Sequence, residues 1–477
     1  MEERMGGPFQ GTVLGGRSRP ALPLAPQAGE QGGVTRRRVV TAAARGAALL
    51  TTAAAAACGA PGAAPSGQPA GAKQLTGTVE FWSNAGYAYS GKLGEKLVGE
   101  FQLANPGLTV SFTDTTYGDF MTKLVSTSAA GTPPDLSYAD RYVTKSFACL
   151  GVARALDDYM KTARAAKPTA FWPRLQHDIT YKGKVWAVPH GPDIGLLYVN
   201  KNLFREAGLD PAKPPTTWDA AAAAIPRLMK RSGGTLERVG WAPQKGWGVP
   251  WMVMYWQLGG ELQSQDESKA IYNNEQAIQT FEWLLKIYEA QGGNDAIEEA
   301  FQKANYMDAF AQGRMAMVWA TYSTWRTRWE KELSLDVGFT YWPTPPNGRH
   351  GNYMGGWSLI IPKQAKNPDG AFHYLDFLSG DEPQIRWAEE WNNVPATKSA
   401  AESARYIGND PVRKIAVGEM PTAKWVITAP GGDKALKFQT GVATDILTRK
   451  LGIRDALAES VKNVQAELDE AQRNCGI

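Results

Sequence analysis

The chain has 477 residues, of which 43% are hydrophobic, and it carries 51 basic and 47 acidic side chains. Residues 1–57 hold seven arginines and three glutamates, which leaves 44 basic and 44 acidic groups in the rest of the chain. A nucleic-acid partner needs a basic face on the folded domain, so this balance leads us to expect none. The length is sufficient for two domains with hydrophobic cores of their own.

The N-terminal segment has the pattern of an export signal. Arg36–Arg38 precede a run of small apolar residues that ends at Cys58. Only 12 residues separate Arg45 from Cys58, whereas a membrane-spanning helix needs about 20 apolar residues. The pattern therefore predicts a signal peptide over residues 1–57.

Two short motifs in this segment resemble known export elements. Residues 35–40 resemble the twin-arginine motif, and residues 55–58 resemble a bacterial lipobox without its usual Leu. The resemblance implies that the Cys58 thiol is acylated and anchors the exported protein at the outer face of the cytoplasmic membrane. A plain signal-peptidase site with an idle Cys58, the general secretory route, and another start codon within residues 1–34 stay open.

Residues 58–75 have the composition of a flexible tether, because no large apolar side chain occurs between residues 59 and 74. The two other cysteines, Cys149 and Cys475, lie far apart, and the sequence leaves open whether they pair. The four histidines are scattered and no Cys/His spacing suggests zinc. We therefore expect no metal site and no cofactor.

From residue 76 onward, strand patterns alternate with helix patterns. Residues 76–84 alternate in polarity as a strand does, a helix is expected through about residue 105, and residues 106–115 form the next strand. A helix near 118–130 and a strand near 133–140 follow. This alternation predicts an α/β domain with a mainly parallel sheet. Helical patterns recur at residues 218–229 and 274–291 and near the C-terminus.

Residues 181–221 resemble the extracellular solute-binding proteins (family 1) of carbohydrate ABC importers, which are similar to maltose-binding protein. The matching positions are Gly183, Trp186, Pro189, Tyr198, Asn200, Phe204, Ala207, Gly208, Pro214, Pro215, Thr217 and Trp218. Four more stretches agree in the expected order: "TVEFWSN", "GTPPDLSYADR", "AFAQGRMAMVWATYSTW" and "GGWSLIIPKQAKNPDGAFHYLDFL". The resemblance covers roughly residues 76–470.

This resemblance implies a two-lobed periplasmic-binding-protein-like fold of type II, with a ligand cleft between the lobes. Each lobe is expected to hold a mixed, mainly parallel sheet flanked by helices. The chain is expected to cross between the lobes near Pro189–Asp193, Gly355–Trp357 and Asn392–Val394. Lobe 1 then comprises residues 76–189 and 357–392, and lobe 2 comprises residues 193–354 and 394–470.

The tryptophans suit a sugar ligand. The chain has 17 Trp, and flat apolar rings can cover the C–H face of a pyranose. Forked polar side chains such as Asp, Asn and Arg can each hold two hydroxyls. Many of these rings must belong to the core, and Trp256 and Trp283 are expected to do so.

We expect ligand contacts where the chain leaves an element toward the cleft. The Asp-Arg pair at 140–141 resembles a sugar-binding pair of the maltose-binding relatives. "WATYSTW" departs from the family's Gly-x-Trp ending, so the stacking ring stays open. The candidates are Asn84, Tyr87, Asp140, Arg141, His190, Asp193, Trp247, Trp251, Tyr322, Trp325, Gly356, Trp357, Trp391 and Asn392.

The sequence therefore predicts a monomeric binding protein that captures a sugar or oligosaccharide and passes it to membrane permease subunits. It has no phosphate-binding loop for ATP. Two alternatives stay open. The same fold could bind a glycerol phosphodiester, a peptide or a polyamine, and a secreted glycoside hydrolase would also have an aromatic cleft but needs a pair of carboxylates.

Overall fold

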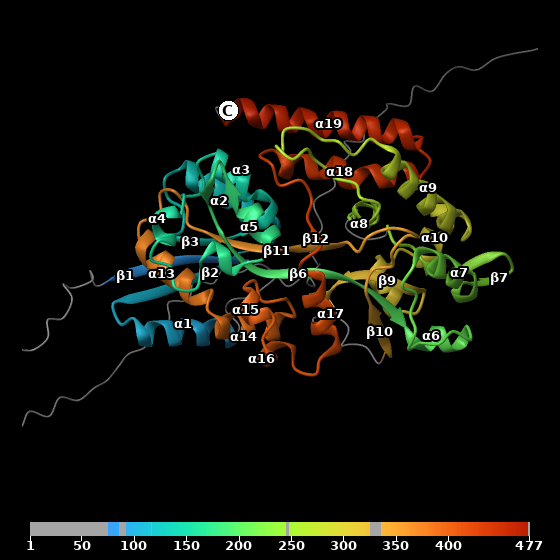
Figure 1. Ribbon diagram of the computed structural model, residues 1–477, viewed down its shortest axis with the longest axis horizontal. Helices are drawn as coiled ribbons and strands as arrows, with labels where there is room; N and C mark the ends of the chain where they lie inside the picture. The colour runs from blue at the N-terminus through green and yellow to red at the C-terminus, as the bar shows by residue number, and fades with distance from the viewer. Residues whose placement is uncertain (1–74, 85–91, 116, 245–247, 325–334, 476–477) are drawn as a thin grey trace, which may run out of the picture.

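The computed structural model describes residues 75–84, 92–115, 117–244, 248–324 and 335–475 (Figure 1). The predicted signal peptide, most of the predicted tether and Cys58 lie outside these residues.

The described chain begins with three parallel strands separated by helices, as the alternating pattern predicts. β1 pairs with β2 along its whole length, with Gly77 opposite Leu108 and Asn84 opposite Thr115, and it also pairs with β3. Val79 and Phe81 of β1 are buried and form the start of the core. The bounds are β1 Gly77–Asn84, α1 Lys92–Ala104, β2 Leu108–Thr115, α2 Tyr117–Ala129 and β3 Leu136–Asp140.

Short elements connect β3 to a long buried strand. They are η2 Arg141–Val143, α3 Thr144–Cys149, α4 Asp157–Met160, η3 Pro168–Ala170, α5 Pro173–Ile179, β4 Thr180–Tyr181 and β5 Lys184–Val185. The long strand is β6, Val188–Asn200, and all 13 of its residues are buried. A strand buried on both faces at this length runs through the middle of a molecule rather than along an edge.

The second half of the fold is built around β6 and a further long strand, β11 (Asn352–Ile360). The elements between them are α6 Lys201–Glu206, α7 Trp218–Leu228, β7 Lys230–Ser232, β8 Thr235–Trp241, α8 Pro250–Gln257, α9 Glu275–Glu289, α10 Gly293–Phe301, α11 Tyr306–Ala311, β9 Met315–Thr321, α12 Tyr322–Thr324 and β10 Val337–Thr340. After β11 come α13 Pro368–Leu378, α14 Asp381–Trp391, α15 Lys398–Ala401, α16 Ala404–Ile407, α17 Pro411–Glu419, β12 Ala423–Lys424, α18 Gly432–Leu447 and α19 Ile453–Asn474.

The two long strands join both halves of the molecule into one sheet. Its order is β2-β1-β3-β11-β6-β9-β8-β7, with β10 also on β6 and β12 also on β11. The early residues of β6 pair with β11, and its later residues pair with β9 and β10. The sheet is mixed, as expected. Pairing is parallel in β2-β1-β3, β8-β9 and β11-β12, whereas the joining strands are antiparallel. Figure 1 shows β6 and β11 crossing the middle, with α18 and α19 above and α14–α17 below.

Tryptophans fill the core beside β9. Trp342 packs against Trp241 and Trp319, with ring centroids 5.5 and 6.4 Å apart. A Cβ atom at Gly195 would come within 2.4 Å of Trp319 Nε1, so only glycine allows β6 to pass this ring. Trp256 is buried as predicted, and Trp283 packs against this core.

Trp251 belongs to the core rather than to an exposed surface. It is fully buried, its indole Nε1 donates to the backbone oxygen of Gln439 at 3.0 Å, and its ring lies 5.2 Å from that of Phe281. The sequence placed Trp251 beside a cleft because it follows a Gly-rich turn. In the structure, Trp251 of α8 instead packs against α9 and hydrogen-bonds to α18.

The helix boundaries follow from local capping. Thr217 precedes α7 and accepts a hydrogen bond from Ala220 N, and Asn274 does the same for α9 through Ala277 N.

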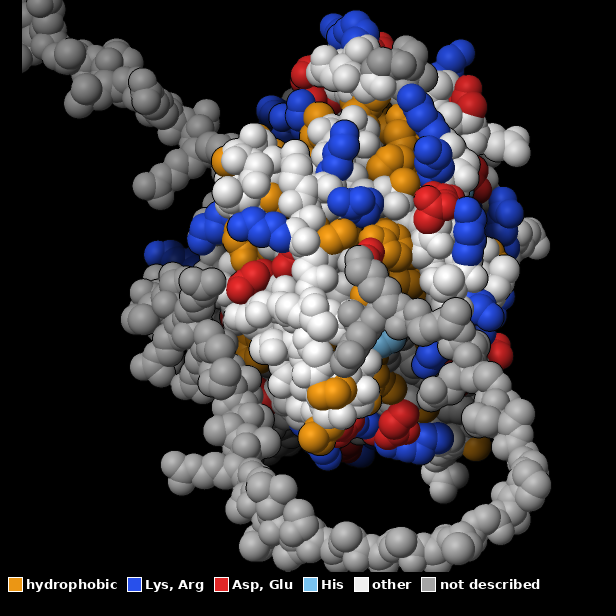
Figure 2. Space-filling view, turned by 90° about the vertical axis from the view of Figure 1, so that its left-hand side faces the viewer, with side chains coloured by type: hydrophobic (Ala, Val, Ile, Leu, Met, Phe, Trp, Pro, Cys, Tyr) orange, Lys and Arg blue, Asp and Glu red, His pale blue; other side chains and the backbone are white. Residues whose placement is uncertain are grey.

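Among the described helices, none combines the length and the hydropathy that a membrane span requires. Figure 2 shows basic and acidic side chains interspersed over the face that it presents.

Replacing Trp251 by Ala should lower the free energy of unfolding by about 3–5 kcal/mol, because it leaves a large cavity among aromatic neighbours. Urea denaturation followed by circular dichroism measures this difference. The matched control is Leu103→Ala, whose side chain is 86% exposed and whose effect should stay within about 0.5 kcal/mol. Equal stability of Trp251→Ala and the wild type would contradict the core assignment.

Candidate functional site

Three segments that are distant in sequence meet at the centre of the sheet. β11 runs antiparallel to β6, with Gly355 opposite Asp193 and Trp357 opposite His190, and the register shifts between these two pairs. The amide of Val394 donates to the backbone oxygen of Pro192 at 2.9 Å. The segments Pro189–Asp193, Gly355–Trp357 and Asn392–Val394, named from the sequence as crossings, thus form a single junction.

Glycine is required where two of these segments touch. Gly356 has φ +119°, and a Cβ atom there would lie 2.7 Å from the backbone oxygen of Gly191. Gly191 itself has φ +57°. A larger residue at either position would be strained, because both backbones have a positive φ and the two segments approach closely at Gly356. The bulge in β11 at Gly356 therefore fits closely against the turn in β6.

Arg141 holds this junction from the side of η2. Its guanidinium Nε donates to Asp178 Oδ2 at 2.8 Å, Nη1 donates to the backbone oxygen of Gly355 at 2.9 Å, and Nη2 donates to that of Met354. Arg141 is fully buried. Burial lowers the pKa of Arg141, while Asp178 opposes this shift. The sequence named Arg141 as a ligand contact, and in the structure its donors serve β11 and α5.

Asp178 balances two arginines. Its other oxygen, Oδ1, forms an ion pair with Arg174, one turn earlier in α5, whose Nε lies 2.8 Å away. Although burial raises the pKa of Asp178, Arg174, His177 and Arg141 together hold it below its ordinary value. The charge of Arg141 is therefore paired inside the protein, as a buried guanidinium requires.

His190 is a buried neutral ring. Its Nδ1 lies 3.1 Å from the Tyr138 hydroxyl, and its ring packs 4.9 Å from that of Trp387. Burial lowers the pKa of His190 to about 3, so the ring is uncharged at neutral pH. His190 shapes the junction through packing.

Asp193 is a buried carboxylate that joins β6 to the end of β9. It accepts from Ser323 N at 3.2 Å and from Ser323 Oγ at 2.5 Å. Burial raises the pKa of Asp193 to about 6, although hydrogen bonds from Ser323 and Thr321 oppose the shift. This carboxylate connects the first crossing to the segment that leads into residues 325–334.

Tyr322 connects the same segment to the third crossing. Its ring is buried, and its hydroxyl is hydrogen-bonded with Arg413 and Tyr406. The Tyr406 hydroxyl in turn donates to the backbone oxygen of Asn393 at 2.7 Å. Tyr322 is thus part of a buried network, whereas the sequence suggested a stacking surface.

Aromatic rings line one side of the junction. Trp357 lies 5.9 Å from Phe120 and 6.1 Å from Tyr138 between ring centroids. Trp391, which is partly exposed, lies 5.9 Å from Trp387. The sequence named Trp357 and Trp391 but missed Trp387, whose spacing of i, i+4 to Trp391 on α14 was the available signal.

Two adjacent asparagines carry unsatisfied polar atoms at the third crossing. Asn392 Oδ1 and both side-chain polar atoms of Asn393 are buried without a hydrogen-bond partner. Asn392 has φ +55° at the end of α14. An unsatisfied buried polar group costs about 1–3 kcal/mol, so these atoms are suited to a bound molecule. The sequence named Asn392 and missed Asn393.

The remaining candidates lie at strand ends or outside the described residues. Asp140 ends β3, is buried, and stands opposite Trp357 of β11. Asn84 ends β1 opposite Thr115. Tyr87, Trp247 and Trp325 lie outside the described residues.

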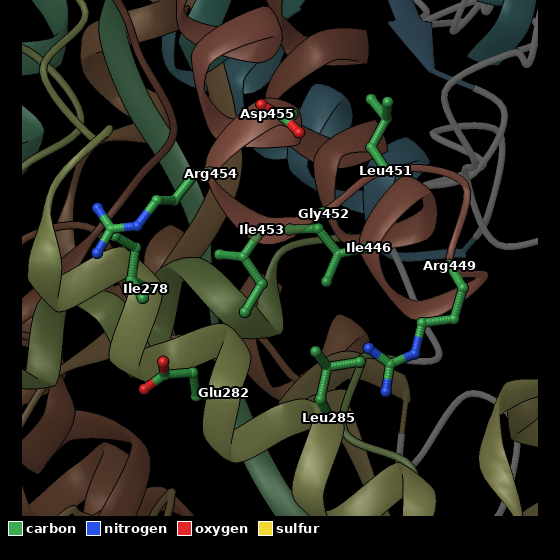
Figure 3. Close-up of a pocket in the computed structure, with 10 residues that line it drawn as sticks. All are labelled: Ile278, Glu282, Leu285, Ile446, Arg449, Leu451, Gly452, Ile453, Arg454 and Asp455. Carbon is green, nitrogen blue, oxygen red and sulfur yellow. The ribbon is translucent and has the colours of Figure 1, made fainter.

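A separate hollow lies away from the junction (Figure 3). It has a volume of about 420 Å³ and is formed by α9 and the turn between α18 and α19. Its wall mixes Leu285 and Ile453 with Glu282 and Arg454. None of the predicted site residues lines it, so we place the candidate site at the junction.

Within the described ranges, no three His, Cys, Asp or Glu side chains are grouped as metal ligands.

The family model described as bacterial extracellular solute-binding protein matches residues 85–385. A relative from Brucella abortus (strain 2308), whose name describes it as a binding protein, is 25% identical over 388 residues, which are 80% of this chain and 90% of the relative. The sn-glycerol-3-phosphate-binding periplasmic protein UgpB of Salmonella typhimurium is 24% identical over 250 residues, 50% of this chain and 56% of that protein.

Among solved structures, the cyclic alpha-maltosyl-1,6-maltose binding protein from Arthrobacter globiformis superposes with a TM-score of 0.71. The identity is 21%, and the match covers 83% of this chain and 100% of the other. This likeness confirms the two-lobed α/β fold that the sequence predicts.

Asp193→Asn should remove a pH dependence of stability. The folded pKa of about 6 lies above the ordinary value of 3.8, so this group's contribution to stability is full below pH 3.8 and is lost as pH rises through about 6. Between pH 4 and pH 7.5 the stability difference should therefore change in favour of the variant by up to about 3 kcal/mol. Urea denaturation from pH 4 to 8 measures the difference, and curves that stay parallel over this range would contradict the assignment.

Proposed function

Because the chain belongs to the bacterial extracellular solute-binding protein family, we propose that it captures a sugar or oligosaccharide outside the cytoplasmic membrane and delivers it to an ABC permease. The observation that carries this proposal is the junction, where aromatic rings and unsatisfied polar atoms meet between two halves of one sheet. Neighbours of the same fold include proteins named for oligosaccharides, such as the Arthrobacter globiformis protein.

The junction is the proposed hinge. Lobe 1 would comprise residues 76–189 and 357–392, and lobe 2 residues 193–354 and 394–470. Strand pairing supports these boundaries, since β3 pairs with β11 from Trp357 onward and β9 pairs with β6 from Gly195 onward. A solute that touches both lobes has more contacts when they are closed, and this difference in affinity shifts the population toward the closed form.

The proposed ligand contacts are the candidates that reach the junction or the strand ends beside it. They are Asn84, Asp140, Gly356, Trp357, Trp391 and Asn392, with Asn393 added. Tyr87, Trp247 and Trp325, which lie outside the described residues, are proposed as contacts from the sequence. Arg141, His190, Asp193, Trp251 and Tyr322 are proposed to position them, because each is buried and bonded or packed within the protein. The unsatisfied amides would bond hydroxyls, and a ligand without hydroxyls would leave them unpaired.

Export and anchoring remain part of the proposal. The family's extracellular placement implies export. The twin-arginine motif, the acylated Cys58, the tether over residues 58–75 and a monomeric state are proposed from the sequence. A lipid on Cys58 would hold the carrier near its permease and raise its effective concentration there.

A phosphorylated solute is the alternative with a specific observation behind it, namely the likeness to UgpB. A phosphate group needs cationic donors. Arg141 at the described junction is already bonded to Asp178 and two backbone oxygens. Because its donors are already used within the protein, Arg141 favours an uncharged solute.

A hydrolase activity would require paired carboxylates across a glycosidic bond, and release of reducing sugar would reveal it.

A thermal-shift screen of the full chain tests the proposal, with maltotriose, mannobiose and sn-glycerol 3-phosphate as probes. A ligand at 100 times its dissociation constant stabilises the fold by about 2.7 kcal/mol, which raises the melting temperature by several degrees. Asp140→Asn should abolish the rise at an unchanged basal melting temperature. The matched control Asp158→Asn alters a side chain that is 92% exposed on α4, and it should keep the rise. A folded sample that responds to sn-glycerol 3-phosphate alone would contradict the carbohydrate assignment.

A further inference from the structure

The C-terminal hairpin extends from one half of the molecule to the other. α18 and α19 pack against each other and against α9, and α18 also reaches η2. Cys475, which follows α19, forms a disulfide with Cys149 of α3, 326 positions earlier. Figure 1 shows α19 running along the top of the molecule from the side of α9 to the side of α3.

A second tie connects the same two regions at the start of α18. The Ser146 hydroxyl donates to Asp433 Oδ1 at 2.6 Å and accepts from the Gly431 amide at 3.2 Å. Gly431 has φ +87°, and a Cβ atom there would lie 2.5 Å from the backbone oxygen of Glu467 in α19. Glycine thus lets the hairpin pack tightly while its end contacts α3.

A third tie is formed by Glu267, which lies in the loop between α8 and α9. Its carboxylate accepts from Lys145 Nζ at 2.6 and 2.8 Å, and its Oε1 lies 3.0 Å from His177 Nε2. Gln465 of α19 holds this loop by donating to Ser268 O and accepting from Ala270 N, both at 2.9 Å. The loop and the hairpin therefore act as one body.

All three ties cross the proposed lobe boundary on the same face. The side chains of α3 and α5 belong to the proposed lobe 1, whereas the loop, α18 and α19 belong to the proposed lobe 2. We propose that α19 is a strap, closed by Cys149–Cys475, that limits how far the two lobes separate. This inference rests on the proposed two-lobed binding function.

The covalent tie and the polar ties have different roles. Hydrogen bonds and ion pairs exchange with water at little net cost, so a hinge motion can break them. A disulfide does not open with the hinge, and it persists in an oxidising compartment. The disulfide therefore sets the limit of opening, and the Glu267 and Ser146 contacts favour the closed end of that range.

Amide hydrogen exchange of the full chain, with and without dithiothreitol, tests the strap. Reduction breaks the S–S bond and leaves two thiols, while dithiothreitol supplies two electrons and two protons and becomes its cyclic disulfide. The Gly431 amide reports lobe separation directly because its acceptor, Ser146 Oγ, lies across the boundary. Its exchange should accelerate about tenfold on reduction, since opening is no longer restricted.

Variants and control amides separate this effect from local fraying. Cys475→Ser should reproduce the effect of reduction, and Glu267→Gln should give a smaller acceleration with the disulfide intact. The Ala270 amide, held by Gln465 within lobe 2, should stay unchanged. The matched control Arg454→Ala removes a contact to Glu275 within the same lobe and should leave Gly431 exchange unchanged.

Acceleration confined to the last turn of α19 and the end of α3, or none at all, would overturn the strap. Free thiols at both cysteines in the oxidised, folded protein would overturn it as well. These outcomes are separate from the fate of the proposed function, because a sugar-induced rise in melting temperature can persist in Cys475→Ser. A missing rise in both wild type and variant, with Gly431 accelerated, would instead contradict the sugar assignment.

Discussion

The whole architecture depends on the close approach of β11 to β6 at Gly191 and Gly356. Neither strand could pass the other here with a side chain on Gly356, because a Cβ atom would collide with the backbone of Gly191 and Pro192. Arg141 then fixes the bulged strand through two backbone oxygens. Since β6 and β11 are also the strands that join the two halves of the sheet, we place the proposed hinge at this point.

The same junction explains why charged groups are buried there. The charge of Arg141 is balanced by that of Asp178. Asp193 accepts hydrogen bonds from Ser323, and burial is what raises its pKa. Buried polar groups of this kind fix one arrangement of the segments, because any other arrangement leaves them unpaired. The two asparagines at the third crossing retain unsatisfied side-chain atoms, and we propose that a bound solute pairs with them.

The sequence predicted the local strands and helices well, because alternation, helical periodicity and the family motifs are local signals. The three crossings stay a proposal, although the segments named for them meet at the junction. It could not predict that Trp251 and Tyr322 turn inward, since a ring beside a Gly-rich or polar turn has the same local pattern whether it is exposed or buried. Nor could it predict the partner of Arg141 or the pairing of Cys149 with Cys475. Those contacts depend on which face of α3 and α5 meets β11 and the C-terminal hairpin, and only the tertiary fold decides that.

Small-angle X-ray scattering of the full chain, without solute and then with saturating maltotriose or another oligosaccharide that binds, tests the central claim most directly. The account predicts a smaller radius of gyration with solute, because the lobes close about the junction. Binding without any change in the radius of gyration would contradict closure about this hinge.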